Sequence, residues 1–268
     1  MKNMTLTQIS TNAWAVLMAV FLCVPIVAIL PISFSAGSFL SYPLPGFSMQ
    51  WYHQVLQPYP WIFSLKNSLI VGVASTFLSV VLGTLAAYGM TGVKFRGKTL
   101  VSVVLMLPMV VPVVISALSM YFFLNRLGLL GTYTGLIVAH TALAMPFVVV
   151  TVAATLQGFD RNLVRAASSL GCHPARTFMT VTLPLILPGV VSGAIFAFIT
   201  SFDEVVVALF VSSPSTLTLP RQLFSGLRDQ VTPALVAIAT LLIILSLLLM
   251  ATVGFLSRRT ERLTQTAH

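Results

Sequence analysis

One segment has the residue types of a nucleotide-binding loop, but its surroundings exclude that chemistry. Residues 92–99 read GVKFRGKT and match the pattern G-x-x-x-x-G-K-T, whose backbone N–H groups and lysine hold phosphates. Such a loop works only between a buried strand and a helix N-terminus, with an acidic residue elsewhere to hold Mg²⁺. Here apolar runs of membrane-helix length flank it on both sides. We therefore interpret Lys94, Arg96 and Lys98 as a basic hairpin that fixes membrane topology.

Two adjacent acidic residues, Asp203 and Glu204, fall within an apolar run. An Asp near the centre of a membrane helix costs roughly 2.5 kcal/mol or more, so both carboxylates need water or partners. In a continuous helix they would point about 100° apart, with Asp203 on the face of Thr200. These three residues are candidates for a polar path that attracts a cationic solute. The structural alternative is a charged end of the helix, satisfied by Arg221, Arg228 or water.

The remaining reactive side chains do not form a catalytic or metal-binding pattern. Cys23 lies in an apolar run and Cys172 in a polar segment, without CxxC or Cys/His spacing. The four histidines are scattered, and no credible nucleophile–base pair accompanies them. The sequence therefore predicts neither a metal site nor a disulfide, and the chain is not expected to be an enzyme.

The composition is that of an integral membrane protein. Of 268 residues, 57% are hydrophobic and only 7% are charged, which leaves too little polar surface to coat a water-soluble globule. The formal net charge is +9, but the basic residues stand in short tracts beside apolar runs. We therefore predict contact with membrane lipid and no nucleic-acid partner.

Six apolar stretches are long enough to cross a bilayer, because a membrane helix needs about 20 mostly apolar residues. The first exceeds the roughly 7–15 residues of a signal-peptide core and is interpreted as a retained span. The sequence thus predicts an all-α membrane protein with six transmembrane helices in one domain, residues 1–268. The expected spans are 13–34, 67–90, 100–124, 136–156, 185–211 and 234–256.

The basic residues also predict an orientation, since cytoplasmic loops carry an excess of Lys and Arg. Six spans place both termini on one side of the membrane. Ten basic residues share that side: Lys2, Lys94, Arg96, Lys98, Arg161, Arg165, Arg176, Arg258, Arg259 and Arg262. The other side carries Lys66, Arg126, Arg221 and Arg228. Both termini and the loop 161–184 are therefore expected in the cytoplasm.

The longest external loop, roughly 35–66, contains four prolines together with tryptophans and tyrosines. Prolines prevent a continuous helix, and aromatic rings suit the headgroup layer of the membrane. A short segment, 49–56, could lie along the membrane surface. Either an aromatic belt that anchors the loop or a docking site for an external partner fits this composition.

The cytoplasmic loop 161–184 is a polar, glycine-broken segment between two apolar runs. Small side chains at Ala166 and Ala167 let a short helix lie close in a groove. Gly171 can leave helical geometry and turn the chain, while Pro174 suits the first turn of a new helix. A compact knob at the membrane face is expected. An ordinary connection between spans, in which a Leu-Pro pair opens the next span, is the alternative.

This loop resembles the EAA loop of ABC importer permeases. In that motif Glu-Ala-Ala is followed four positions on by Gly and then, after a spacer, by an apolar residue, any residue, Leu and Pro. The matching residues here are Ala166, Ala167, Gly171, Val181, Leu183 and Pro184, while Arg165 replaces the leading Glu. The resemblance implies type I importer permease architecture. It also implies that Arg165, Ala166, Ala167, Gly171, Leu183 and Pro184 couple the chain to an ATPase.

The resemblance also implies partners and a location. It predicts a second homologous permease, two ATP-binding subunits that hold ATP and Mg²⁺, and a periplasmic solute-binding protein, with no cofactor on this chain. A multi-pass protein of the bacterial inner membrane follows. Three stretches look like the second permease of the polyamine (spermidine/putrescine) branch: 65–69 (LKNSL), 201–206 (SFDEVV) and 219–220 (LP). An ion-gradient-driven secondary transporter is the alternative function, although the internal repeats typical of such carriers are not discernible.

Overall fold

The computed structural model describes residues 6–92, 95–229 and 231–248, and within them every regular element is a helix or helical turn. These residues form two compact units. One holds the residues up to Ile62 and those from Ser225 onward, and the other comprises Phe63–Phe224. The two units are described separately below.

The first unit consists of apolar helices and a long structured loop. A candidate membrane span covers Ser10–Phe34, and its residues from Ser10 to Ile29 are exposed in the isolated chain, as expected of a helix that meets lipid or another subunit. Its elements are α1 (Leu6–Ile29), η1 (Leu30–Phe34), α2 (Gln50–Val55), η2 (Pro58–Ile62) and the apolar helix Pro233–Leu248.

The loop 35–66, predicted to be external, is folded back onto the end of the first span. Trp51 Nε1 donates a hydrogen bond to the Ser35 carbonyl (2.7 Å), and the hydroxyls of Ser33 and Tyr52 lie 2.7 Å apart. Helix α2 falls within the predicted surface segment 49–56. Phe39 and Phe47 remain exposed, so the loop presents aromatic side chains outward. Exposed aromatic side chains fit both predicted roles of the loop, an aromatic belt in the headgroup layer and a docking site for an external partner.

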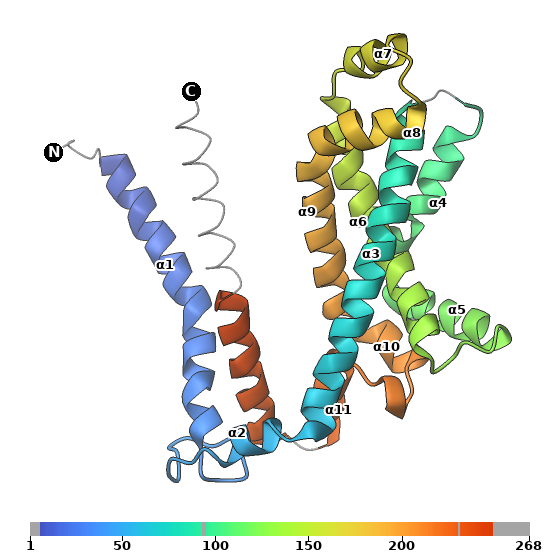
Figure 1. Ribbon diagram of the computed structural model, residues 1–268. Coiled ribbons are helices and arrows are strands. Elements are labelled where there is room, and N and C mark those ends of the chain that lie inside the picture. The colour runs from blue at the N-terminus through green and yellow to red at the C-terminus, as the bar shows by residue number, and fades with distance from the viewer. Residues whose placement is uncertain (1–5, 93–94, 230, 249–268) are drawn as a thin grey trace. The chain divides into compact units, whose positions relative to one another are not determined.

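Three long helices form the core of the second unit and lie side by side in Figure 1: α3 (Phe63–Gly92), α6 (Tyr133–Gln157) and α9 (Leu183–Phe202). Glycines on α3 and α9 let both helices approach α6. A Cβ on Gly83 would lie 2.8 Å from Val148 Cβ, and one on Gly193 would lie 3.0 Å from Val148 Cα. Because small residues allow close helix contact within a membrane, α6 is held between its two neighbours.

Shorter elements complete the second unit. Between α3 and α6 lie α4 (Lys98–Val110) and α5 (Val113–Arg126). The polar segment between α6 and α9 contains α7 (Asn162–Ser169), α8 (Pro174–Thr177) and the π-helical turn η3 (Phe178–Thr182). After α9 come α10 (Val206–Val211), η4 (Pro214–Thr216) and α11 (Leu219–Asp229), which runs on into the first unit.

The six predicted spans are not all recovered. Four described helices are long and apolar enough to cross a membrane, and a bent pair makes a fifth if it counts as one span. In that pair, the predicted span 100–124 breaks into α4 and α5, which meet at 107°. Pro112 lacks a backbone N–H, and Val111 before it is extended (ψ 134°), as residues preceding proline prefer. The helix is therefore interrupted at Pro112, between α4 and α5.

The fifth span also differs from the prediction of 185–211. The helical span covers Pro174–Phe202, and it contains Pro184 because the π-helical turn before that residue rearranges the backbone hydrogen bonds. It ends at Phe202, and α10 begins only at Val206. The assumption of one continuous helix through Asp203 and Glu204 is therefore wrong.

Several predictions concern residues outside the described part of the chain. The predicted sixth span, 234–256, is described only to Leu248, where the helix from Pro233 is too short to qualify as a span by itself. Of the basic residues used for the orientation, Lys2, Lys94, Arg258, Arg259 and Arg262 lie outside the described residues. The assignment of 1–268 to a single permease domain stays a prediction.

Candidate functional site

The polar segment between α6 and α9 begins with a short amphipathic helix. The Asp160 carboxylate accepts a hydrogen bond from the backbone N–H of Asn162 (2.9 Å), which satisfies a free donor in the first turn of α7 and places a negative charge at its positive end. Three predicted site residues, Arg165, Ala166 and Ala167, lie in the middle of this helix. The predicted short helix of the loop is present.

Gly171 ends α7 in left-handed geometry, with φ 77°. The Cys172 N–H donates to the Ala167 carbonyl (3.0 Å) and the Gly171 N–H donates to the Ser168 carbonyl (3.0 Å). This pair of bonds is a Schellman cap, which needs a residue with positive φ at the position of Gly171. No atom lies within 4 Å of where a Cβ would stand. The requirement for glycine within this chain is therefore conformational, not steric.

The next candidate membrane span begins with a second capped turn, α8. His173 Nδ1 accepts a hydrogen bond from the Ala175 N–H (3.3 Å), and Pro174 occupies the first turn of α8, as predicted. Leu183 and Pro184, also predicted site residues, stand at the start of α9 behind the π-helical turn. They lie within the continuous span, so they do not open it.

One face of α7 is apolar and exposed. Leu163, Ala166 and Leu170 recur at the three- and four-residue spacing that puts side chains on the same side of a helix. Leu163 is 45% exposed and Leu170 is 88% exposed. Burial of a leucine side chain is worth roughly 1.5–3 kcal/mol, so this face is complementary to an apolar groove. Our sequence reasoning missed Leu163 and Leu170, although their spacing with the alanines was visible.

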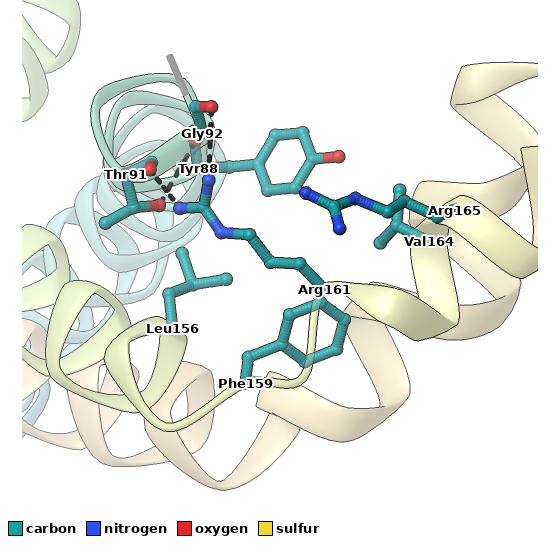
Figure 2. A pocket seen from close by; sticks show the side chains of 8 residues that line it. All are labelled: Tyr88, Thr91, Gly92, Leu156, Phe159, Arg161, Val164 and Arg165. Atoms are coloured by element: carbon teal, nitrogen blue, oxygen red, sulfur yellow. Dashed lines mark hydrogen bonds between the residues drawn. The ribbon is translucent and has the colours of Figure 1, made fainter. Parts of the chain in front are cut away.

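The segment is attached to the end of α3 at two points. The Arg161 guanidinium, just before α7, donates to the Gly92 carbonyl (3.3 Å) and to the Thr91 carbonyl (Figure 2). Beyond α7, the rings of Tyr88 and Phe178 pack edge to face with centroids 4.9 Å apart. A cation beside the last carbonyls of a helix donates to acceptors that have no partner within the helix. Its positive charge also interacts favourably with the negative end of the helix dipole.

A cavity of about 300 Å³ lies between the ends of α3 and α6 and the start of α7. Its lining combines apolar side chains with two hydroxyl-bearing residues and two arginines. The lining residues are Tyr88, Thr91, Gly92, Leu156, Phe159, Arg161, Val164 and Arg165 (Figure 2). Arg165 also donates to Asn162 Oδ1 in its own helix (3.4 Å). Arg161 and Arg165 thus face the same cavity with different hydrogen-bond partners.

The residues of the predicted polar path lie near two helix breaks, the α4–α5 bend and the gap between α9 and α10. A cavity of about 240 Å³ is lined by Thr200 and Glu204 together with residues on both sides of the α4–α5 bend. The structure therefore brings two of the three predicted residues together. Asp203 is exposed and does not line this cavity.

Glu204 also has a structural role. Its Oε1 accepts a hydrogen bond from the Val207 N–H (2.8 Å) and so caps the start of α10. Arg221, a predicted partner for the acids in the structural alternative, donates instead to the Ser212 carbonyl (2.7 Å). Glu204 is therefore held at the helix break by its bond to Val207, and Arg221 does not pair with its carboxylate.

Buried polar contacts connect the helices of the second unit at the start of α3, the end opposite to α7. Asn67 Nδ2 donates to the Leu217 carbonyl (2.9 Å), and the Ser68 hydroxyl accepts from the Leu219 N–H (2.8 Å). Two of the stretches that look like the polyamine branch, 65–69 and 219–220, are thereby brought together. Both contacts join the start of α3 to the segment that leads into α11.

A further network joins the three long helices near the end of α9. His140 Nδ1 lies 2.8 Å from the Ser201 hydroxyl, which in turn accepts a hydrogen bond from the Ser75 hydroxyl (2.8 Å). His140 is almost fully buried. Because a buried polar group needs a partner, this chain of side chains specifies how α3, α6 and α9 meet just before the helix break.

Comparison with known proteins identifies the class. Residues 79–262 match the family described as "Binding-protein-dependent transport system inner membrane component". That match covers more than half of the chain and includes α7, both helix breaks and the cavities described above. The chain belongs to this family of inner-membrane transport components.

Two curated relatives refine the comparison. The chain is 33% identical over 249 residues to the spermidine/putrescine transport system permease protein PotC of Haemophilus influenzae, a match that covers 92% of this chain and 96% of the relative. It is 31% identical over 234 residues to the putrescine transport system permease protein PotI of Escherichia coli, covering 83% and 82%. The predicted resemblance to polyamine permeases is confirmed.

A solved structure confirms the fold. A chain in the crystal structure of a bacterial ABC transporter involved in the import of the acidic polysaccharide alginate superposes with a TM-score of 0.75 at 17% identity, covering 95% of this chain and 99% of that one. The type I importer permease fold is therefore confirmed, although not all six spans are.

The family also defines the kind of protein. This chain is a multi-pass inner-membrane permease subunit of an ABC importer and not an enzyme, because ATP hydrolysis in this family lies in separate subunits. Family members work in general with a partner permease, ATPases and a binding protein.

Proposed function

We propose that this chain forms, together with a second homologous permease, the transmembrane path of an importer for a small polyamine-like cation. Two ATP-binding subunits carry ATP and Mg²⁺, and a periplasmic binding protein delivers the solute. Two relatives are named as spermidine/putrescine and putrescine permeases, which supports a polyamine-like solute. The observation that carries the coupling part of the proposal is the exposed apolar face of α7.

In this proposal α7 is the element that an ATP-binding subunit grips. A rigid helix capped at Gly171 presents Leu163, Ala166 and Leu170 outward in the pattern of helix-in-groove recognition. Arg165 stands beside this face, where the family motif has Glu. Closure of the two ATP-binding subunits then displaces α7 and changes access across the bilayer by rigid-body motion of the spans.

The orientation proposed for the chain places α7 and both termini in the cytoplasm. In the second unit α7 lies at the same end as the C-terminus of α3, where Arg96, Lys98, Arg161, Arg165 and Arg176 gather in sequence around the two loops. An excess of basic residues marks the cytoplasmic side of membrane proteins. The charge distribution therefore supports a cytoplasmic location of α7, on the side of the membrane where ATP is present.

The proposed solute path runs along the helix breaks. Thr200 and Glu204 line the cavity beside the α4–α5 bend, and the Phe147 ring lines it as well. A carboxylate attracts an ammonium group, and an aromatic face adds cation–π attraction. Asp203, one residue away and exposed, adds a second negative charge near this region. These residues favour a cationic solute over an anionic one.

Site-directed cross-linking tests the coupling role. In a chain with Cys172 replaced by Ser, Ala166→Cys places a thiol on the apolar face of α7, and Ser168→Cys places one on a different face as the matched control. In intact membranes, Ala166→Cys should capture an ATP-binding subunit much more efficiently than Ser168→Cys. Capture by neither variant, at normal expression, would contradict the proposal.

A further inference from the structure

Arg161 connects two segments that are far apart in the sequence. It lies at the entrance to α7, and its guanidinium donates to two carbonyls at the end of α3, those of Gly92 (3.3 Å) and Thr91. Both acceptors are backbone atoms in the last turn of the helix. Figure 2 shows the Arg161 side chain extended across the space between the two helices, with its guanidinium at the α3 carbonyls.

The surroundings make this connection important for the movement of α7. A cavity of about 300 Å³ separates the start of α7 from the ends of α3 and α6, so close packing does not fill this space. Since side chains transmit displacement where they are in contact, a hydrogen-bonded guanidinium that crosses the cavity is a direct link. After α7 in the sequence, the Tyr88–Phe178 ring pair provides a second attachment of this segment to α3.

We propose that Arg161 is a positioning residue that makes α3 follow the movement of α7. This inference rests on the proposed coupling role of α7. Without the guanidinium, α7 remains joined to α6 and α9 through the chain, but its first turn can move relative to the end of α3. Because α3 packs along both α6 and α9, a displacement passed to α3 reaches the whole three-helix core.

Arg176 provides a control for Arg161. Both arginines are exposed and belong to the polar segment between α6 and α9. Arg176 lies in α8, outside the predicted coupling residues, and among the described residues its guanidinium makes no hydrogen bond to α3. Either substitution removes one positive charge from the segment, whereas only the change at Arg161 removes a bond to α3.

The experiment compares Arg161→Gln, Arg161→Lys and Arg176→Gln in the complete complex, with the partner permease, ATP-binding subunits and binding protein, reconstituted in liposomes. Uptake of a labelled polyamine and ATP hydrolysis are measured per assembled complex. We expect Arg161→Gln to retain assembly and ATP hydrolysis and to lower the uptake per ATP about fivefold or more. Arg161→Lys should lie between that variant and the original, because one ammonium replaces a two-pronged donor.

An unchanged uptake per ATP in Arg161→Gln overturns the proposal, as does an equal loss in Arg176→Gln. Loss of assembly in both Arg161 variants also overturns it, because Arg161 would then hold the complex together instead of positioning α7. Failure of α7 itself as the coupling element is distinguished by the cross-link from Ala166→Cys, which would be absent in the otherwise unaltered chain.

A distance measurement gives a readout that a purely structural role would not change. Spin labels at Ser169 on α7 and Leu85 on α3, both exposed, report their separation after Cys23 and Cys172 are replaced by Ser. With Arg161 in place, the distance should be the same in nucleotide-free and ATP-trapped complexes. In Arg161→Gln it should shift or broaden between the two states, and an unchanged distribution contradicts the proposal.

Discussion

Replacement of Gly171 offers a sharp test of how the geometry of α7 serves coupling. The residue has φ 77°, and an L-residue other than glycine pays about 1–2 kcal/mol for left-handed geometry. No atom of the chain lies within 4 Å of a Cβ at this position, so the cost for Ala is conformational. Because 1–2 kcal/mol changes an equilibrium about 5- to 30-fold, the capped end of α7 should open that much more often in Gly171→Ala.

Hydrogen exchange in the purified permease measures this opening directly. The N–H groups of Gly171 and Cys172 are bonded to carbonyls in the last turn of α7, and in Gly171→Ala they should lose protection by about 5- to 30-fold. Gly171→Asn is the matched control, since Asn tolerates left-handed geometry and should lose much less. Equal loss of protection in the Ala and Asn variants would refute the conformational argument.

The same series separates backbone geometry from contact with the ATPase. In the isolated permease, Gly171→Trp should behave like Gly171→Ala, because the surroundings of the residue are open. In the assembled complex, Trp should uncouple ATP hydrolysis from uptake more severely than Ala if a partner surface covers this end of α7. Normal uptake by Gly171→Trp at normal expression and membrane insertion would exclude a coupling role for this turn.

Two further predictions concern the helix core and the solute path. Gly193→Ile should destabilise the permease by about 1–3 kcal/mol and lower its yield and thermal stability in detergent, since a Cβ there stands 3.0 Å from the Val148 Cα. Gly89→Ile, at an open position, should leave both unchanged, and equal effects would contradict the packing argument. Glu204→Gln should reduce uptake of a cationic solute about tenfold, the effect of roughly 1.4 kcal/mol of lost attraction, while retaining assembly. Asp203→Asn, outside the cavity, should have a smaller effect on uptake, and unchanged uptake by both variants would remove the electrostatic role.

The sequence predicted those features that depend on local chemistry. Composition identified a membrane protein because the hydrocarbon core accepts long apolar helices and few charges. The turn at Gly171 and the first helical turn at Pro174 followed from backbone rules that involve only a few neighbouring residues. The pattern of the 161–184 segment was also sufficient to recognise the importer permease family.

Only the tertiary structure decided how the pieces meet. The sequence predicted one span over 100–124, but the 107° angle between α4 and α5 depends on the elements packed around them. The end of α9 at Phe202 removed the assumed helical relation between Asp203 and Glu204. The bridge from Arg161 to α3 joins residues about 70 positions apart, and the exposure of Leu170 depends on what the fold leaves uncovered. Local patterns contain little information on such long-range contacts, because these are selected by the packing of the whole helix bundle.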